Sequence, residues 1–284
     1  MPEFIACIDG SPATAAVCDA AAWAVASQPE PAVTLLHVLD HTHYPVVSDF
    51  SGSIGLGSRE HLLVALAELD EQRSKLALEQ GEALLADAKT RLQARGISAT
   101  ARQRHGDLLE CILELSETMS LLIMGRHGDL SAHQHRHIGS HVENVIRALH
   151  RPILIAPDDF TPPKTGVLLA YDGSASSRQA VQFLMHNPLF AGLPVHLLMI
   201  GADTLDAQAQ LQWAQTQLLK ASIDTSVAIR PGDVSRGILA YQADHGLDAV
   251  VMGAYGHSRL RQFFVGSTTT ALLRHCQSPL LLLR

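Results

Sequence analysis

The two halves of the chain carry the same short motifs in the same order. Near the start of each half an apolar run ends in Asp-Gly-Ser, at residues 9–11 and again at 172–174. Later, Met-Gly is followed by a second glycine, at 124–128 and at 252–256. A Gly-Ser pair and a closing apolar run complete each half, at 139–140 and 152–155 and at 266–267 and 279–282. A repeated order of motifs predicts two copies of one structural unit.

The length supports the same division, because 284 residues is enough for about two domains of ordinary size. Residues 157–164 are rich in proline and acidic residues, which is typical of a linker. We therefore predict an N-terminal domain over 1–159 and a C-terminal domain over 160–284. The first half is longer than the second, and its extra residues form an insertion around 41–75.

Short apolar runs alternate with longer helical patterns, which predicts βαβ units around parallel sheets. The expected class is α/β, with two tandem doubly wound domains. Each should hold an open five-stranded parallel sheet of order 3-2-1-4-5 with helices on both faces. The predicted strands are 4–8, 33–39, 99–105, 121–125 and 152–156 in the first half, and 166–171, 195–200, 225–230, 249–253 and 279–283 in the second.

Three helices have recognisable boundaries. Ser11 and Ser174 are expected to cap the first helix of each half, with Pro12 in the first turn of the former. A long helix or helix pair is predicted over 58–95, ending at Gly96. Its apolar stripe is expected to form a half-buried face, and its members are Leu62, Leu66, Leu69 and Leu76.

Composition argues against several classes of partner. The net charge of −7, with 21 lysines and arginines, provides no basic field for nucleic acid. No apolar run approaches the ~20 residues needed to cross a bilayer, and no export signal is recognised. The four cysteines lie far apart and predict neither a zinc site nor a disulfide framework. A cytoplasmic protein without nucleic-acid or membrane partners is expected.

A candidate phosphate site lies in the second half. Met252 and Gly253 end a predicted strand, Gly256 follows, and after nine residues comes the start of a helix. Glycines after a strand let a ligand approach the backbone, and a helix start offers free N–H groups to phosphate. The residues at that helix start are Gly266, Ser267 and Thr268. Ordinary tight turns and a helix cap would account for the same residues.

At these motifs the chain resembles the universal stress protein family in its tandem two-domain form, over nearly its whole length. ATP-binding members of that family carry Gly-x2-Gly-x9-Gly-Ser/Thr, and the spacing of Gly253, Gly256, Gly266 and Ser267 is the same. The resemblance implies ATP, with Mg as a companion, as the cofactor. It also implies contacts from Asp172, from the backbone near Ile200, and from Met252 beside the adenine.

The first half departs from that pattern, because ten residues rather than nine precede its Gly-Ser pair. Its equivalent residues are therefore weaker candidates for a nucleotide site. They are Asp9, Val38, Gly125, Gly128, Gly139 and Ser140.

The same loop of the first half is dense in histidine. His133, His135 and His137 alternate with other residues, so an extended segment would place three imidazoles on one face, suited to zinc, copper or nickel. No matched second motif supports a metal site, and a solvated, pH-sensitive loop is the favoured interpretation.

No motif for efficient catalysis is present, since the chain lacks a Walker lysine, a nucleophile elbow and a His-Glu-x-x-His helix. The resemblance implies a regulatory nucleotide-binding protein of the bacterial stress response. The alternatives are a scaffold that binds no nucleotide and, less favoured, a slow ATPase. The closing strands of the two halves are predicted to pair with each other, and a homodimer is a further expectation.

Overall fold

The computed structural model describes residues 3–39, 56–126, 140–254 and 266–284, with the backbone alone at 56–63 and 140. Every statement about structure below concerns these residues. The first half contains β1 (Glu3–Cys7), α1 (Thr14–Val25), β2 (Ala32–Leu39), α2 (Leu56–Gln93), β3 (Ser98–His105), α3 (Leu108–Glu114), β4 (Met119–Gly125), α4 (Ser140–Ala148) and β5 (Ile153–Ala156).

The second half repeats this order and adds a short 3₁₀ helix. Its elements are β6 (Val167–Ala170), α5 (Ala175–His186), η3 (Pro188–Phe190), β7 (Val195–Ile200), α6 (Leu205–Lys220), β8 (Thr225–Arg230), α7 (Val234–Asp244), β9 (Ala249–Gly253), α8 (Ser267–His275) and β10 (Leu280–Leu283). All ten predicted strands are present within about two residues of their expected bounds.

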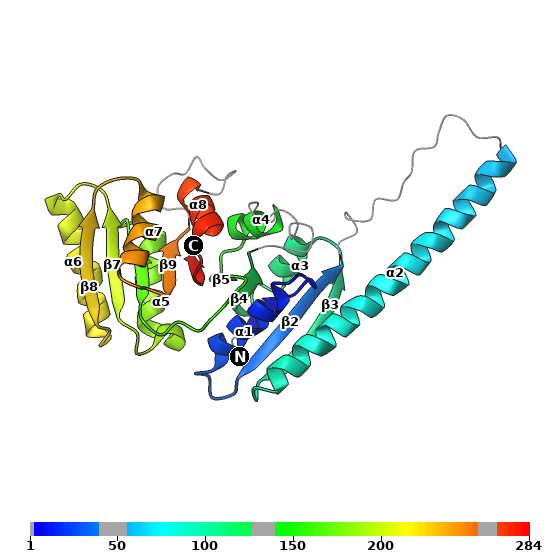
Figure 1. The fold of residues 1–284 in the computed structure, drawn as a ribbon, viewed down its shortest axis with the longest axis horizontal. Helices are drawn as coiled ribbons and strands as arrows, with labels where there is room; N and C mark the ends of the chain where they lie inside the picture. Colours follow the sequence, from blue (N-terminus) through cyan, green and yellow to red (C-terminus); the bar gives the residue numbers. More distant parts are fainter. Residues whose placement is uncertain (1–2, 40–55, 127–139, 255–265) are drawn as a thin grey trace.

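The strands form one continuous sheet in the order β3-β2-β1-β4-β5-β10-β9-β6-β7-β8. Within each half the order is the predicted 3-2-1-4-5 and every neighbouring pair is parallel. The halves meet where β10 pairs antiparallel with β5, so the predicted pairing of the closing strands is confirmed. Figure 1 shows the two halves side by side around this junction.

Two apolar layers enclose the sheet, as expected for a doubly wound fold. One layer joins the sheet to α1, α2, α5 and α6, and the other joins it to α3, α4, α7 and α8. Both layers draw residues from both halves. At the junction, Leu154 of β5 belongs to the first layer, whereas its neighbours Ile153 and Ile155 belong to the second. This alternation is the period of two expected of a strand.

The first helices of the two halves begin differently. Ser174 caps α5 as predicted, because its hydroxyl oxygen accepts a hydrogen bond from the N–H of Ser177 at 3.2 Å. The prediction that Ser11 caps α1 is wrong. The helix begins at Thr14 after an N-cap at Ala13, and the Ser11 hydroxyl is buried without a hydrogen-bond partner. A turn, closed by the N–H of Thr14 on the carbonyl of Ser11 at 3.0 Å, delays the helix start.

Two arginines reach across the junction between the halves. Arg126 follows β4, is 6% exposed, and donates a hydrogen bond to the backbone carbonyl of Cys276 at the end of α8. In the opposite direction, Arg284 donates to the carbonyl of Arg147 near the end of α4. Each arginine therefore satisfies a carbonyl at the C-terminal end of a helix in the other half, where cations are favoured.

Helix α2 is a single 38-residue helix, and only its C-terminal part packs on the body. Leu85, Ala88 and Leu92 are buried, and Asp19 of α1 pairs at 2.8 Å with Arg91 of α2 and at 2.8 Å with Arg95, which follows the helix. Leu69 and Leu76, in the stripe predicted to form a solvated, half-buried face, are 41% and 65% exposed. The N-terminal half of α2 projects beyond the sheet (Figure 1), where no described element covers it.

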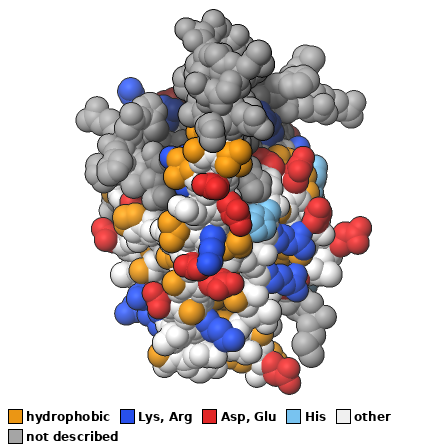
Figure 2. All heavy atoms as spheres, turned by 90° about the vertical axis from the view of Figure 1, so that its right-hand side faces the viewer, with side chains coloured by type: hydrophobic (Ala, Val, Ile, Leu, Met, Phe, Trp, Pro, Cys, Tyr) orange, Lys and Arg blue, Asp and Glu red, His pale blue; other side chains and the backbone are white. Residues whose placement is uncertain are grey.

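The surface around α2 carries charges of both signs. Figure 2 shows acidic and basic side chains interspersed with apolar ones on this side of the molecule. No described helix is long and apolar enough to cross a membrane.

Candidate functional site

The sequence-predicted site residues of the second half gather at the carboxyl edge of its sheet. Asp172 lies two residues after β6, Ile200 is the last residue of β7, and Met252 and Gly253 end β9. Because these strands are parallel, their carboxyl ends share one edge. Gly266 and α8 follow the loop after β9. Gly256 lies in that loop, outside the described residues.

Asp172 shapes the turn that begins this edge. Its Oδ1 accepts a hydrogen bond from the N–H of Ser174 at 3.0 Å, a local turn typical of aspartate. Gly173 has a φ of +75°, which a residue with a side chain rarely adopts. A Cβ there would also lie 1.8 Å from the side-chain oxygen of Gln210. The turn therefore depends on glycine and fixes where the carboxylate stands.

Gly253 has a structural role besides any contact with a ligand. A Cβ at this position would lie 2.5 Å from the hydroxyl oxygen of Ser176 and 2.7 Å from the backbone nitrogen of Ser177. The end of β9 therefore lies directly against the first turn of α5. Sequence reasoning attributed this glycine to approach by a ligand, whereas the described neighbours show approach by a helix.

The start of α8 has the features of an anion site. Gly266 is its N-cap, and no side chain of the described residues caps the helix. Ser267 is exposed and Thr268 is half-buried. Such a turn carries a partial positive charge that attracts phosphate. A Cβ on Gly266 would meet only Oγ1 of Thr269, at 3.8 Å.

Apolar residues lie behind the polar ones at this edge. Met252 is 6% exposed and belongs to the same apolar layer as Tyr241 and Ala254. Ile200 is partly buried and packs on the α7 backbone, since a Cβ on Gly237 would lie 2.7 Å from its Cδ1. The site thus combines an apolar floor with a carboxylate turn and a helix start.

The first half has the same turn at its carboxyl edge. Oδ1 of Asp9 accepts from the N–H of Ser11 at 3.0 Å, and Gly10 has a φ of +79°. Val38 lies near the end of β2, and Gly125 ends β4. Ser140 begins α4, while Gly128 and Gly139 lie outside the described residues, as do His133, His135 and His137. The residue after Gly125 is Arg126, which points across the junction to α8.

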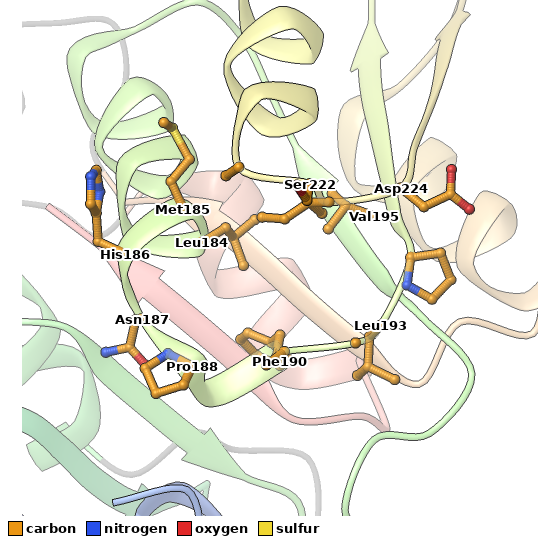
Figure 3. Close-up of a pocket in the computed structure, with 15 residues that line it drawn as sticks. Leu184, Met185, His186, Asn187, Pro188, Phe190, Leu193, Val195, Ser222 and Asp224 are labelled. Carbon is orange, nitrogen blue, oxygen red and sulfur yellow. The ribbon is translucent and has the colours of Figure 1, made fainter.

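The opposite edge of the second half is hollowed. Figure 3 shows a pocket of about 500 Å³ between the end of α5, the start of β7 and the turn after α6. Its walls combine apolar residues, with Phe190, Leu193 and Val195 among them, and polar ones such as Asn187 and Asp224. Because it lies at the amino ends of the strands, this pocket is separate from the candidate phosphate site.

A cluster of polar aromatic residues between β7 and α7 was not recognised from the sequence. The rings of Tyr241 and His245 stack with centroids 3.8 Å apart, and Nδ1 of His196 lies 3.2 Å from the Tyr241 hydroxyl. Burial lowers the pKa of His196, the nearby His245 lowers it further, and Asp224 opposes the shift. In the sequence, this cluster is indicated only by the i, i+4 spacing of Tyr241 and His245, which places both rings on one side of a helix.

Acid is expected to weaken the folded protein through His196. Its pKa is lower in the folded chain than its ordinary 6.5, so the unfolded chain binds more protons just below that pH. The stability contributed by the neutral imidazole is present above pH 6.5 and is lost as the pH falls through the folded pKa. In urea titrations at a series of pH values, His196→Gln should reduce this loss.

Neighbouring residues give the matched tests. Asp224→Asn should steepen the loss of stability below pH 6.5, because Asp224 raises the pKa of His196, and His245→Gln should make it shallower. Some loss of stability below pH 6.5 should remain in every variant, since burial also lowers the pKa of His150. Identical slopes in all three variants and the parent would contradict this assignment.

The cysteines do not form a reactive site. All four thiols are free, and burial raises the pKa of Cys7 to about 12 and that of Cys18 to about 11. Thiolate is the reactive form of cysteine, so these side chains are poor nucleophiles at neutral pH. Among the described residues no group of three or more His, Cys, Asp or Glu is placed to hold a metal ion.

The fold defines the class of protein as a tandem pair of doubly wound α/β units joined into one sheet. The sequence profile described as the universal stress protein family matches residues 3–157 and again 165–284. The chain therefore belongs to the universal stress protein family and carries two copies of its domain.

Individual proteins and solved structures are similar to this chain. Universal stress protein Slr1230 from Synechocystis sp. is 36% identical over 289 residues, covering 100% of both chains. A universal stress protein from Archaeoglobus fulgidus has a similar fold, with a TM-score of 0.73 and 21% identity over 99% of this chain and 98% of that one. A family member from Arabidopsis thaliana, solved with AMP bound, is 15% identical over 42% of this chain and 91% of its own, with a TM-score of 0.34.

Proposed function

We propose that this universal stress protein is a regulatory nucleotide-binding protein whose C-terminal half holds ATP at the carboxyl edge of β6, β7 and β9. The observation that carries the proposal is the convergence of three features at one edge. They are the Asp172 turn, the apolar floor at Ile200 and Met252, and a start of α8 that no described side chain caps.

Each feature suits one part of a nucleotide. The carboxylate of Asp172 can accept hydrogen bonds from ribose hydroxyls, and the partly buried apolar residues offer a surface to the base. Ser267, Thr268 and the first N–H groups of α8 can bind phosphate oxygens. The spacing of Gly253, Gly256 and Gly266 matches the pattern of ATP-binding family members, which supports ATP and an accompanying Mg ion.

A binding role fits this edge better than catalysis. The sequence carries no motif for phosphoryl transfer, and among the described residues no group of three or more His, Cys, Asp or Glu is placed to hold a metal ion. We propose that bound nucleotide changes stability or partner binding during stress in the cytoplasm. We also propose that the N-terminal domain ends at residue 159 and the C-terminal domain begins at residue 160.

The alternative function, a scaffold that binds no nucleotide, is supported by the junction between the two halves. The closing strands β5 and β10 pair with each other inside the chain, so the two halves already pack as two subunits would. A scaffold of this kind would need no ligand to assemble. It would show no response to nucleotide in the experiment below.

Blocking the start of α8 is expected to abolish binding. We would compare melting temperatures with and without Mg-ATP for the parent protein and for Gly266→Trp. Ligand at 100 times its dissociation constant adds about 2.7 kcal/mol of stability, which the parent should show as a clear shift. The variant should fold, because among the described residues a Cβ at Gly266 meets only Oγ1 of Thr269, at 3.8 Å, yet its indole would fill the phosphate position.

The matched control is Leu219→Trp, which adds an indole at a leucine that is 53% exposed near the C-terminal end of α6, toward the amino edge of the sheet. It should keep the shift. A Gly266→Trp protein that still responds to Mg-ATP would place the nucleotide elsewhere, and a parent that does not respond at millimolar ATP would favour the scaffold.

A further inference from the structure

The N-terminal half of α2 exposes apolar side chains that the body does not cover. Val64, Leu69 and Leu76 are 53%, 41% and 65% exposed. Farther along, α2 is joined to β3 at Leu78, whose carbonyl accepts a hydrogen bond from the Gln103 side chain at 3.4 Å. Residues 64–77 therefore project for about 21 Å without a partner among the described elements, at 1.5 Å per residue.

Leu69 and Leu76 belong to a sequence stripe with the spacing of a coiled coil. Successive members of the stripe are separated alternately by four and three residues. They are Leu62, Leu66, Leu69, Arg73 and Leu76, so one position of the stripe is an arginine. A stripe with this spacing faces a second helix rather than a sheet. An isolated helix of this length is marginal in water, so packing against a partner would stabilise it.

The position of Arg73 decides what the partner is. In a parallel pair of identical helices, Arg73 would face Arg73 of the other copy at the core of the interface. In an antiparallel pair centred on residue 71, Arg73 lies level with Leu69 of the other copy, and Leu66 with Leu76. The aliphatic stem of Arg73 can then cover that leucine, while its guanidinium reaches Asp70 of the other copy.

The remaining charges favour the same arrangement. A parallel pairing would set every charge level with its own copy. The antiparallel pairing sets Glu68 between the levels of Arg73 and Lys75 of the other copy, and leaves only Glu71 level with itself. The face also has room for the partner, because Gln80 and Ala83 continue the stripe and are exposed. The buried side chains of α2 lie on its other face, against α1, β2 and β3.

We propose that two copies of this chain associate through an antiparallel pairing of their α2 helices over residues 64–77. The interface is separate from the β5–β10 junction and from the candidate nucleotide site. It needs no ligand, so the test does not depend on the proposed nucleotide binding.

Sedimentation equilibrium of the full-length protein tests the pairing. The parent should be a dimer that dissociates on dilution, and Leu69→Glu with Leu76→Glu should raise its dissociation constant by about tenfold or more. The control is Leu205→Glu with Leu219→Glu, which makes the same change of charge on exposed leucines of α6. Unchanged melting temperatures would show that each variant is folded.

Charge exchange tests the orientation. Asp70→Arg and Arg73→Glu should each weaken the dimer, and the two together should restore it, because each pairs with the other across an antiparallel interface. A parent protein that is still monomeric at a concentration of about 1 mM overturns the proposal. A dimer that survives the leucine changes, or a charge exchange that restores nothing, overturns it equally.

Discussion

Replacing Leu154 and Leu281 by alanine is expected to lower the free energy of unfolding by about 2–5 kcal/mol each. Both side chains are 0% exposed, and the two residues are register partners where β5 meets β10. Each truncation removes buried apolar contacts and leaves a cavity at the centre of the ten-stranded sheet. Because both apolar layers contain residues of both halves, we expect the two halves to unfold together.

Urea denaturation followed by circular dichroism measures both effects. The double variant should depart from additivity by about 0.5–3 kcal/mol, since neighbouring residues share packing partners. Leu205→Ala, at an exposed site on α6, should change stability by less than about 0.5 kcal/mol. Two separate transitions, with only one half weakened by each change, would contradict a single cooperative junction.

The two motif glycines Gly253 and Gly266 are expected to respond differently to alanine. Gly253→Ala should cost about 1–3 kcal/mol or more, because its Cβ would lie 2.7 Å from the backbone nitrogen of Ser177. The first turn of α5 cannot move away without disturbing the serine hydrogen bonds that begin it. Gly266→Ala, whose Cβ meets only Thr269 at 3.8 Å, should cost under about 0.5 kcal/mol.

Thermal or chemical denaturation without nucleotide gives the comparison directly, with each alanine variant serving as the control for the other. Equal costs at the two positions would mean that β9 and α5 are not in close contact. If Gly253→Ala left the free energy of unfolding unchanged, the glycine would not be needed for packing against α5, and close approach of a ligand would be its only remaining role.

Strand positions were predictable because buried strands of a parallel sheet are continuous apolar runs. The segments that became β4, β5 and β10 are almost entirely buried, and their residues allow no other assignment in a repeated βα pattern. The pairing of β5 with β10 also followed from pattern, since each closes a half and would otherwise present an open apolar edge.

Helix details were less predictable because they depend on partners far away in the sequence. Ser11 and Ser174 follow the same Asp-Gly pair, yet only Ser174 caps a helix, since the turn over 11–14 delays α1. The stripe on α2 stays largely exposed, and the side chains that the body buries, Leu85, Ala88 and Leu92, lie on another face of the helix. Spacing alone does not show where a helix leaves its domain.

For the candidate site, sequence reasoning located the edge but not the neighbours of each residue. Asp172, Ile200 and Gly253 lie at the carboxyl ends of parallel strands, as the rule for doubly wound sheets predicts. The contact of Gly253 with α5 involves a helix about 77 residues earlier, which no local pattern encodes. Arg126 was not singled out for the same reason, since its partner Cys276 lies in the other half.

Linking the two units in one chain has a consequence at Arg126. In a symmetric dimer of identical subunits every contact occurs twice, so a residue that suits one side must be tolerated on the other. Here the position equivalent to Arg126 is Ala254, a small buried residue that reaches nothing across the junction. The duplicated chain can therefore place a large cation on one side of its pseudo-twofold axis and an alanine on the other, an asymmetry that no homodimer of the single unit could encode.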